Sequence, residues 1–326
     1  MAASSRSLSA TLRTFHTTHP SVRRPSPAVP VLPQPSSTAN KLLRHSLRSK
    51  GVTVIGTNPK KLSFRTKSSM AEMATEKGKG KLQVFNSEEE LAVSLAKYTA
   101  DLSDKFAKER GAFTVVVSGG SLIKSLRKLT EPPYIDSVEW SKWHVFWVDE
   151  RVVPKDHPES NYKLAYDSFL SKVPILPGHV YAINDALSAE AAADDYENCL
   201  KHLVKSKVVD LSAVTGFPKF DLMLLGMGPD GHVASLFPGH PLVHENKKWV
   251  TFIKDSPKPP PERITFTFPV INSSAYIALV VAGAGKANVV HIALGNGQNT
   301  DLLPVQMVSP EGELTWFLDK DASSKL

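Results

Sequence analysis

The sequence predicts an α/β domain of Rossmann-like, doubly wound architecture, with a largely parallel sheet and helices on both faces. Short, nearly continuous apolar runs alternate with segments of helical periodicity, which is typical of strands buried on both faces. Polar, glycine-containing segments follow several of these runs directly, where parallel strands would end. No composition break or Gly/Ser-rich linker divides residues 80–320, so we expect one domain over 72–320, without internal repeats.

The predicted helices and strands alternate along this domain. Ser87 and Glu90 form a capping-box pattern, which predicts a helix from there to Arg110. Further helices are expected where apolar residues recur at helical spacing, at 121–129, 161–170 and 188–204. Strands are expected at the short apolar runs 112–117, 143–148, 220–225, 249–253, 263–268 and 275–281.

The composition is that of an ordinary soluble globular protein. Apolar residues make up 41% of the 326 residues and charged residues 22%, which excludes collagen-like, coiled-coil and wholly disordered chains. No run of 18 apolar residues occurs, so we expect no membrane span. The single cysteine, Cys199, excludes both an intramolecular disulfide and a four-thiolate metal site.

The formal net charge of +7 comes from the start of the chain. Residues 1–71 hold 12 of the 39 basic side chains and no acidic one, because the first acidic residue is Glu72. The rest of the chain therefore carries 27 basic and 32 acidic side chains. A mildly acidic domain gives no reason to expect a nucleic-acid partner.

Both ends of the chain have the composition of targeting signals. Residues 1–71 are rich in Ser, Thr, Pro and Arg, which predicts a disordered organelle transit peptide, for a plastid more than a mitochondrion; a disordered basic arm is the alternative. Residues 321–326 form a polar tail that we expect to be exposed. It ends in Ser324-Lys325-Leu326, the tripeptide read by the peroxisomal import receptor. We expect the plastid stroma as the main destination and the peroxisome as the second.

Two strand ends are candidate phosphate sites. At Gly119, Gly120 and Ser121 the glycines allow backbone N–H groups to face an anion at the start of a helix; a plain tight turn is the alternative. No Gly-Lys-Ser/Thr follows, which excludes a nucleoside-triphosphate P-loop. Arg151, after Asp149 and Glu150, is placed to clamp a phosphate with two N–H groups; a surface ion pair is the alternative.

The segment Gly226–His232 formally matches the dinucleotide pattern G-x-G-x-x-G, but we reject that interpretation. Pro229 and Asp230 stand where a pyrophosphate would approach the backbone, and no strand-ending acid follows about 20 residues later. We therefore expect no cofactor. The alternative is a glycine-rich turn that presents His232 as a general base, with Asp230 near enough to set its tautomer.

A metal site is not expected, although two histidines four residues apart suggest one. Pro238 and Pro241 interrupt any helix through His240 and His244, so the spacing loses its meaning. A proline-rich segment carries Lys258 and leads to Arg263, and its stiffness favours holding a cation at an anion; a rigid, solvated loop is the alternative.

Lys286 is a further candidate cation after the last predicted strand. Several cations and backbone amides around one histidine, without a metal cage or nucleotide motif, indicate a small phosphorylated substrate. The chemistry they indicate is acid/base catalysis with water.

Taken together, five motifs closely resemble the 6-phosphogluconolactonases of the glucosamine/galactosamine-6-phosphate isomerase superfamily. They occur in that family's order and span about residues 82–318: Ser118-Gly-Gly-Ser121, Val148-Asp-Glu-Arg151, His157-Pro-Glu-Ser-Asn-Tyr162, the run from Gly226 to Gly239, and Lys258-Pro-Pro-Pro-Glu-Arg-Ile-Thr265. The two targeting signals resemble those of a plant plastid and peroxisomal member.

The resemblance implies hydrolysis of 6-phospho-D-glucono-1,5-lactone to 6-phospho-D-gluconate, the second step of the oxidative pentose phosphate pathway. It implies that His232 activates water, and that Asp149 and Asp230 line the catalytic site. The implied phosphate holders are Gly119, Gly120, Ser121, Arg151 and Lys258, with Arg263 and Lys286 as possible further site residues.

Two alternatives remain open from the sequence. An amino-sugar-6-phosphate isomerase/deaminase resembles this chain around the Asp-Gly-His turn, but that family has a glutamate where Phe237 stands here. A non-catalytic sugar-phosphate sensor should have lost the histidine, and His232 is present.

Overall fold

The computed structural model describes residues 80–295 and 301–326. All of them fall in one compact unit. The transit peptide predicted at 1–71 lies outside the described residues.

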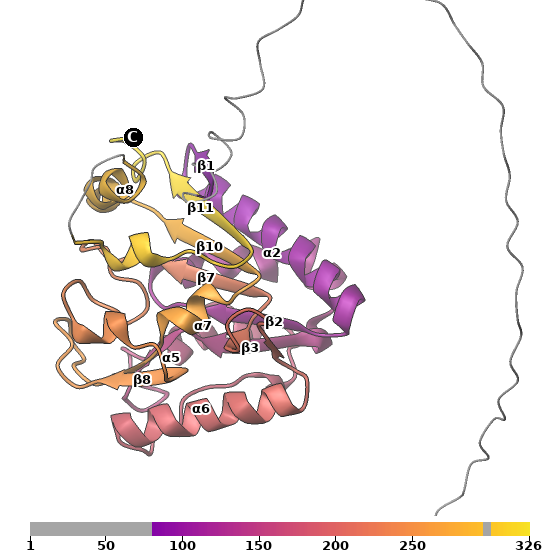
Figure 1. Cartoon of the computed structure of the whole chain (residues 1–326). Coiled ribbons are helices and arrows are strands. Elements are labelled where there is room, and N and C mark those ends of the chain that lie inside the picture. Colours follow the sequence, from indigo (N-terminus) through magenta and orange to yellow (C-terminus); the bar gives the residue numbers. More distant parts are fainter. Residues whose placement is uncertain (1–79, 296–300) are drawn as a thin grey trace, which may run out of the picture. The chain divides into compact units, whose positions relative to one another are not determined.

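A six-stranded sheet forms the centre of this unit (Figure 1). All its neighbouring strands run parallel, which confirms the predicted fold class. In spatial order the strands are β1 (Lys81–Phe85), β11 (Glu313–Asp319), β10 (Tyr276–Val281), β7 (Leu222–Gly226), β2 (Phe113–Val117) and β3 (Trp143–Trp147). Of these, β1 and β11 were not among the predicted strands.

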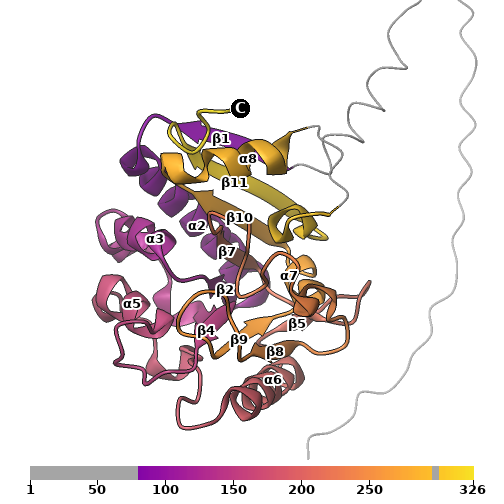
Figure 2. The same cartoon turned by 90° about the vertical axis from the view of Figure 1, so that its left-hand side faces the viewer.

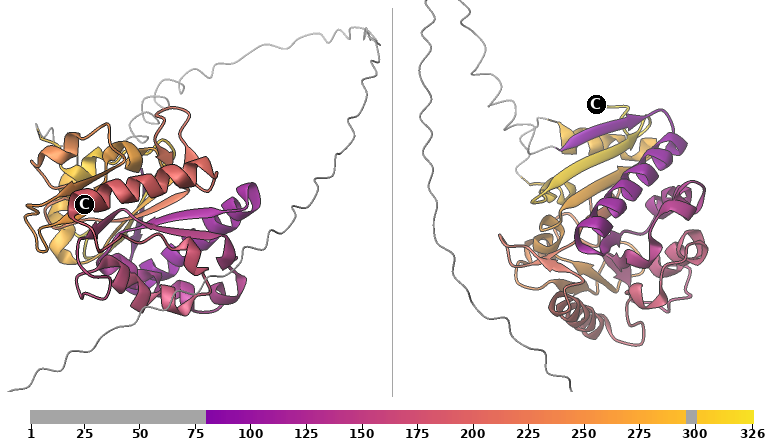
Figure 3. Two further views of the ribbon diagram at one scale, coloured as in Figure 1. Left: turned by 90° about the horizontal axis from the view of Figure 1, so that it is seen from below. Right: turned by 90° about the vertical axis from the view of Figure 1, so that its right-hand side faces the viewer.

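Helices cover both faces of the sheet (Figure 2). On one face lie α2 (Glu88–Arg110), α3 (Ser121–Ser125) and α5 (Asn161–Ser168), and Figure 3 shows α2 lying along the sheet beside β1 and β11. On the other face lie α6 (Ala189–Lys205), α7 (Phe268–Asn272) and α8 (Ala287–Leu294). The short α4 (Tyr134–Ser137) contacts the 3-10 turn that follows α3.

The start of α2 follows the predicted capping pattern closely. The hydroxyl of Ser87 accepts the N–H of Glu90, and the Glu90 carboxylate accepts the N–H of Asn86. A pattern read from sequence therefore places the first turn of the longest described helix correctly.

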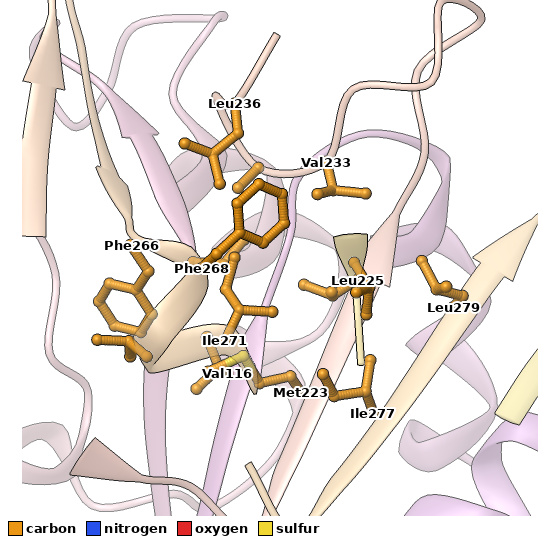
Figure 4. Close-up of a cluster of buried hydrophobic side chains, with 14 of the residues drawn as sticks. Val116, Met223, Leu225, Val233, Leu236, Phe266, Phe268, Ile271, Ile277 and Leu279 are labelled. Atoms are coloured by element: carbon orange, nitrogen blue, oxygen red, sulfur yellow. The ribbon is translucent and has the colours of Figure 1, made fainter. Parts of the chain in front are cut away.

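Side chains alternate between the two faces of the central strands, as a parallel sheet requires. In β10, Ile277 and Leu279 join the core on the α7 side, whereas Ala278 and Val280 join the core under α2. Figure 4 shows the α7 side, where Phe268 packs with the sheet side chains. Both faces are buried, which explains why the strand sequences are nearly continuous in apolar residues.

The structure contains a second, antiparallel sheet that was not predicted from the sequence. The strands expected at 249–253 and 263–268 exist as β8 (Val250–Ile253) and β9 (Arg263–Phe266), but they pair with each other and with β4 (Asp149–Arg151), outside the parallel sheet. The nine residues between β8 and β9 are too few for the crossover that parallel neighbours need. The short loop therefore forces an antiparallel pair.

Short elements complete the described part of the chain. A two-stranded ribbon pairs β5 (Asp210–Leu211) with β6 (Pro218–Lys219). The 3-10 turns are η1 (Leu126–Thr130), η2 (Trp140–Lys142), η3 (Leu170–Lys172), η4 (Pro177–His179), η5 (Pro241–His244), η6 (Ala284–Lys286) and η7 (Pro304–Met307). Among the described helices, none is long and apolar enough to span a bilayer.

The strand order reverses between β2 and β7. From β2 the chain moves outward to β3 and then returns to β7, from which it continues to β10 and β11 on the other side. Such a switch point opens a crevice at the carboxyl ends of the two strands, where ligands bind in doubly wound folds. Ser118 follows β2 there, and β7 ends at Gly226.

The C-terminal segment turns back against the domain. Ser324, Lys325 and Leu326 are exposed, whereas Ala322 is fully buried. The backbone N–H of Ser323 donates to Asp319 and that of Leu326 to Ser323, so the segment is a compact turn.

Candidate active site

A cavity of about 280 Å³ lies at this switch point. It brings together nearly all of the predicted site residues from five separate parts of the chain: Gly119, Gly120, Ser121, Asp149, Arg151, His232, Lys258, Arg263 and Lys286 line it. Asp230 does not line the cavity but contacts His232 directly. The strand-end rule therefore identified residues that are adjacent in space.

His232 is held by Asp230 at the end of the glycine-rich turn. Its Nδ1 lies 2.6 Å from Asp230 Oδ1. Although burial opposes it, the hydrogen bonds of His232 and Lys258 and the charge of His232 lower the pKa of Asp230 to about 2, so this carboxylate only accepts hydrogen bonds. His232 Nδ1 therefore carries the proton, and the lone pair is on Nε2. Among the described residues, no hydrogen-bond partner contacts Nε2.

The surroundings of His232 favour the neutral form of its imidazole. Burial lowers its pKa below the usual value, and the charge of Lys258 adds to this, while Asp230 opposes both. A side chain at Gly228 would place its Cβ 2.0 Å from His232 Nδ1 and 2.5 Å from Asp230 Oδ1. Glycine at 228 is thus what leaves room for the pair.

Lys258 contacts the same pair from the proline-rich loop. Its Nζ lies 3.0 Å from Asp230 Oδ1 and 3.2 Å from His232 Nδ1. The buried Arg263 holds this loop, because its guanidinium donates to the backbone carbonyls of Lys258, Pro259 and Pro260 at 2.9–3.0 Å. Arg263 therefore lines the cavity with its N–H groups already engaged by the loop that carries Lys258.

Arg151 lies opposite Arg263 in the antiparallel register of β4 and β9. Its Nη1 donates to the carbonyl oxygen of Glu159 at 2.7 Å. Its Nε is buried and has no hydrogen-bond partner among the described residues. A buried guanidinium N–H without a partner costs free energy, which an anion in the cavity would recover.

The turn after β2 is shaped by Asn161 at the start of α5. Asn161 Nδ2 donates to the carbonyl oxygen of Asp149 at 3.0 Å, and the side chain is almost fully buried. A Cβ on Gly119 would lie 1.9 Å from Asn161 Oδ1, so only glycine fits there. Gly120 has a φ of +74°, which glycine adopts without strain, and it opens α3 at Ser121.

Asp149 and Phe237 complete the walls around His232. Ser235 Oγ donates to Asp149 Oδ2 at 2.8 Å, which fixes this buried carboxylate at the edge of the cavity. The ring of Phe237 packs on the imidazole of His232 with centroids 4.7 Å apart. An apolar ring therefore stands beside the histidine at the position where the sequence alternative required a carboxylate.

Lys286 approaches the same turn from the loop after β10. Its Nζ donates to the carbonyl oxygen of Met227 at 2.7 Å, and it lines the cavity. Burial lowers the pKa of Lys286, as does the charge of Lys258, while Asp230 opposes the shift. Two ammonium groups thus share one side of the cavity.

No metal centre forms from these groups. In the described parts of the chain, no three His, Cys, Asp or Glu side chains are placed to hold an ion. His240, which the spacing to His244 made a candidate, lies 3.4 Å from Asp255 and does not line the cavity.

Comparison with known proteins identifies the family to which the chain belongs. The sequence profile of the family described as "Glucosamine-6-phosphate isomerases/6-phosphogluconolactonase" matches residues 86–316. The chain belongs to this family. The resemblance drawn from the motifs is confirmed at that level, and the matched range contains every predicted residue of the cavity.

The names of individual relatives agree with this family assignment. The chain is 76% identical over 245 residues to "Probable 6-phosphogluconolactonase 4, chloroplastic" of Oryza sativa subsp. japonica, covering 74% of this chain and 76% of that protein. It is 67% identical over 282 residues to "6-phosphogluconolactonase 3, chloroplastic" of Arabidopsis thaliana, covering 85% and 86%.

Solved structures with the family name are similar to this chain in fold. The 6-phosphogluconolactonase of Thermotoga maritima superposes with a TM-score of 0.63 at 27% identity, covering 74% of this chain and 99% of that chain. The 6-phosphogluconolactonase of Trypanosoma brucei superposes with a TM-score of 0.66 at 25% identity, covering 76% and 99%.

Two cavity neighbours were missed as functional residues by the sequence analysis. Asn161 occurs inside a motif quoted for the family resemblance, and Ser235 follows the Asp-Gly-His turn, but neither was singled out. A polar residue directly after a helix-capping serine is the one signal that could have drawn attention to Asn161, since Ser160 caps α5. Ser235 carries no such signal, because its partner Asp149 is 86 residues away.

Proposed function

We propose that the protein hydrolyses 6-phospho-D-glucono-1,5-lactone to 6-phospho-D-gluconate, with His232 as the general base. The observation that carries this proposal is the Asp230–His232 pair at the wall of a cavity lined by four cations: Arg151, Lys258, Arg263 and Lys286. Family membership supports it, as do the names of the relatives.

The phosphate group fits the end of the cavity formed by Arg151 and the turn at Gly119–Ser121. Arg151 lines the cavity, and its buried Nε has no hydrogen-bond partner among the described residues. Ser121 and the backbone N–H groups of Gly119 and Gly120 would supply the remaining donors. The steric fit between Gly119 and Asn161 holds the turn in place, so the donors are ordered before the ligand arrives.

Lys258 is the second phosphate-holding cation of the proposal. An ammonium group has three N–H donors, and Asp230 takes one of them at 3.0 Å. The remaining donors are free to reach a phosphate oxygen while Asp230 stays bound. Lys286 adds positive charge to the same side, whereas Arg263 acts mainly by holding the Lys258 loop.

His232 carries out the proton transfers. Its Nε2 takes a proton from water as the water oxygen attacks C1 of the lactone, and a bond from that oxygen to C1 forms. When the bond between C1 and the ring oxygen breaks, Nε2 returns the proton to the ring oxygen. Asp230 keeps the required tautomer and offsets the positive charge that His232 carries in between.

The second candidate, an amino-sugar-6-phosphate isomerase/deaminase, is favoured only by the shared family description. A monomeric glucosamine-6-phosphate deaminase resembles this chain with a TM-score of 0.61 at 22% identity, which bears on the fold alone. The packing of Phe237 on His232 argues against the deaminase reaction, because Phe237 occupies the position of that family's glutamate and leaves no carboxylate beside the histidine. The third candidate is a non-catalytic sensor. Binding alone would not require the ordered Asp230–His232 pair, which argues against this candidate.

A coupled assay separates the three candidates. Purified protein is mixed with freshly made lactone, and 6-phosphogluconate is detected by its NADP-dependent dehydrogenase, with the spontaneous hydrolysis subtracted. The proposal predicts rapid turnover of lactone and none of glucosamine 6-phosphate. A protein that binds 6-phosphogluconate without accelerating lactone hydrolysis would be a sensor, and turnover of the amino sugar would indicate a deaminase.

We further propose that the protein acts in the plastid stroma and, as a second destination, in the peroxisome. The two plant relatives reported above carry "chloroplastic" in their names, and the basic, acid-free composition of residues 1–71 supports the first destination. The exposed residues Ser324, Lys325 and Leu326 support the second, through the peroxisomal import receptor.

A further inference from the structure

A buried carboxylate joins the loop after β10 to the C-terminal turn. Asp319, at the end of β11, accepts the backbone N–H of Gly283 at 3.0 Å from each carboxylate oxygen. Its Oδ1 also accepts the backbone N–H of Ala322 at 2.7 Å. Asp319 is 7% exposed, so it joins these two segments away from bulk water.

The loop that Asp319 holds is the one that carries Lys286. Gly283 has a φ of +92° and opens the 3-10 turn η6, in which the N–H of Lys286 donates to the carbonyl oxygen of Gly283 at 3.1 Å. Lys286 Nζ then reaches the carbonyl oxygen of Met227, on the turn that presents His232. A continuous series of contacts therefore runs from Asp319 to the catalytic turn.

The C-terminal turn supports the same segment from outside. Ala322, in this turn, is fully buried. Lys325 Nζ donates to Asn288 Oδ1 at 2.6 Å, and Asn288 lies in the first turn of α8, two residues after Lys286. Residues that are distant in sequence from the cavity thus contact the chain on both sides of Lys286.

Lys286 needs such support because its surroundings repel it. It is half-buried and faces the positive charge of Lys258, with Asp230 as the compensating charge. Since like charges repel, the ammonium group of Lys286 stays near Lys258 through its hydrogen bond to Met227, which depends on where the loop places Lys286. The backbone of Lys286 is fixed through Gly283, and Gly283 through Asp319.

We propose that Asp319 is a positioning residue of the active site, which acts through Gly283 on Lys286, and that the turn at residues 321–326 is its second support. The inference rests on the proposed function, since it assigns Lys286 a part in binding the sugar phosphate. It makes the C-terminal turn part of the frame of the active site, in addition to its proposed role as a targeting signal.

The test is the variant Asp319→Asn. An amide of the same shape keeps one acceptor oxygen but replaces Oδ2 with an NH₂ group. This donor would face the Gly283 N–H at 3.0 Å, so the contact of the carboxylate with Gly283 is weakened. We expect the KM for lactone and the dissociation constant of 6-phosphogluconate to rise roughly three- to tenfold, with kcat changed less than about twofold. The matched control is Asp104→Asn, which alters an exposed carboxylate of α2 that pairs with Lys108 outside the cavity and should leave both constants unchanged.

A double-mutant cycle with Lys286→Met separates positioning from general damage to the fold. If Asp319 acts through Lys286, then Asp319→Asn should weaken binding in the wild-type background and add nothing in the Lys286→Met background. An effect of equal size in both backgrounds, or an unchanged KM in the single variant, would overturn the proposal.

Deletion of residues 322–326 tests the second support, and it also serves if Asp319→Asn does not fold. This variant keeps the Asp319–Gly283 contact but removes those of Ala322 and Lys325, so we expect a rise of roughly two- to threefold in both constants. Wild-type constants in the truncated protein would refute the role of the turn. Binding of 6-phosphogluconate, measured by calorimetry, does not depend on turnover, so a wild-type protein without lactonase activity would refute the proposed function separately.

Discussion

Asp230 and His232, two residues apart on one turn, form a pair in which the carboxylate determines where the imidazole proton sits. Nδ1 of His232 lies 2.6 Å from Oδ1 of Asp230, and the low pKa of Asp230, about 2, keeps that oxygen ionised. Since an ionised carboxylate only accepts, the proton is on Nδ1 and the basic lone pair is on Nε2. In the proposed reaction, the pair is therefore ordered for general-base chemistry before substrate arrives.

The first prediction concerns Asp230→Asn. In the wild type, kcat/KM should fall as the pH drops through the His232 pKa, which burial holds below 6.5, and it should be level above it. Asp230 raises the pKa of His232, so its loss should move this acid limb to lower pH. The level part should fall on the order of 10²-fold or more, because the tautomer is no longer fixed.

The measurement is a profile of kcat/KM between pH 4.5 and 8, with spontaneous lactone hydrolysis subtracted at each pH. An acid limb that moves to higher pH in Asp230→Asn, or a level part equal to that of the wild type, would contradict the assigned role.

The second prediction concerns the phosphate end. Arg151→Ala should raise the KM for lactone by about 10- to 150-fold and change kcat less, because the contact is present in both the ground state and the transition state. Arg151→Lys should bind poorly too, since an ammonium cannot replace a planar fork. Arg127→Ala, which removes the same charge from an ion pair with Glu89 outside the cavity, is the control. Unchanged KM and product affinity in Arg151→Ala would remove Arg151 from the site.

The third prediction concerns stability in acid. His144 in β3 stacks on His179 with centroids 4.0 Å apart, and burial, together with His179 and Arg110, lowers the pKa of His144 to about 4. Because the unfolded chain binds this proton at a pH near 6.5, stability should be complete above pH 6.5 and should decrease as the pH falls toward 4. The loss attributable to His144 is on the order of 2–3 kcal/mol.

The variant His144→Phe keeps an aromatic ring in the stack and removes the titrating group. Denaturant unfolding between pH 4 and 7.5 should show a flatter dependence on pH for this variant than for the wild type. Parallel curves for the two proteins would show that His144 does not contribute to the acid dependence.

The fourth prediction concerns destination. Full-length protein with a C-terminal reporter should be found in plastids, whereas an N-terminal reporter that masks residues 1–71 should redirect the protein to peroxisomes through Ser324, Lys325 and Leu326. Deleting these three residues from the second fusion should abolish the peroxisomal signal. A signal that persists after the deletion, or that never occurs, would show the tripeptide to be a coincidence.

The sequence predicted the central part of the fold, and the meeting of the candidate site residues in one cavity, because both depend on local patterns. Strands such as β2 and β7 are buried on both faces and read as continuous apolar runs. Their polar ends converge because parallel neighbours end at the same edge of the sheet. His232 and Arg151 were identified from their position at such ends, without knowledge of which strands were neighbours.

Other features depend on distant contacts that no local pattern records. Edge strand β1 exposes Leu82 and Val84 by about half, so its apolar residues do not mark the buried side. The partner of β9 is β4, more than 100 residues earlier, which is why the second sheet was not foreseen. For the same reason the hydrogen bond between the Gly283 N–H and the Asp319 carboxylate could not be predicted from the sequence.

The most direct test of the account compares wild-type protein with His232→Ala in the coupled assay with freshly made lactone. Every other group in the cavity binds or orients, and His232 alone is assigned the proton transfers, so its removal should lower kcat by about 10²- to 10⁴-fold and leave KM little changed. Affinity for 6-phosphogluconate, measured on the same preparations, should stay within a few-fold of wild type and thereby show that the site is intact. A purified His232→Ala protein that retains more than about a tenth of the wild-type kcat would contradict the assignment of the general base.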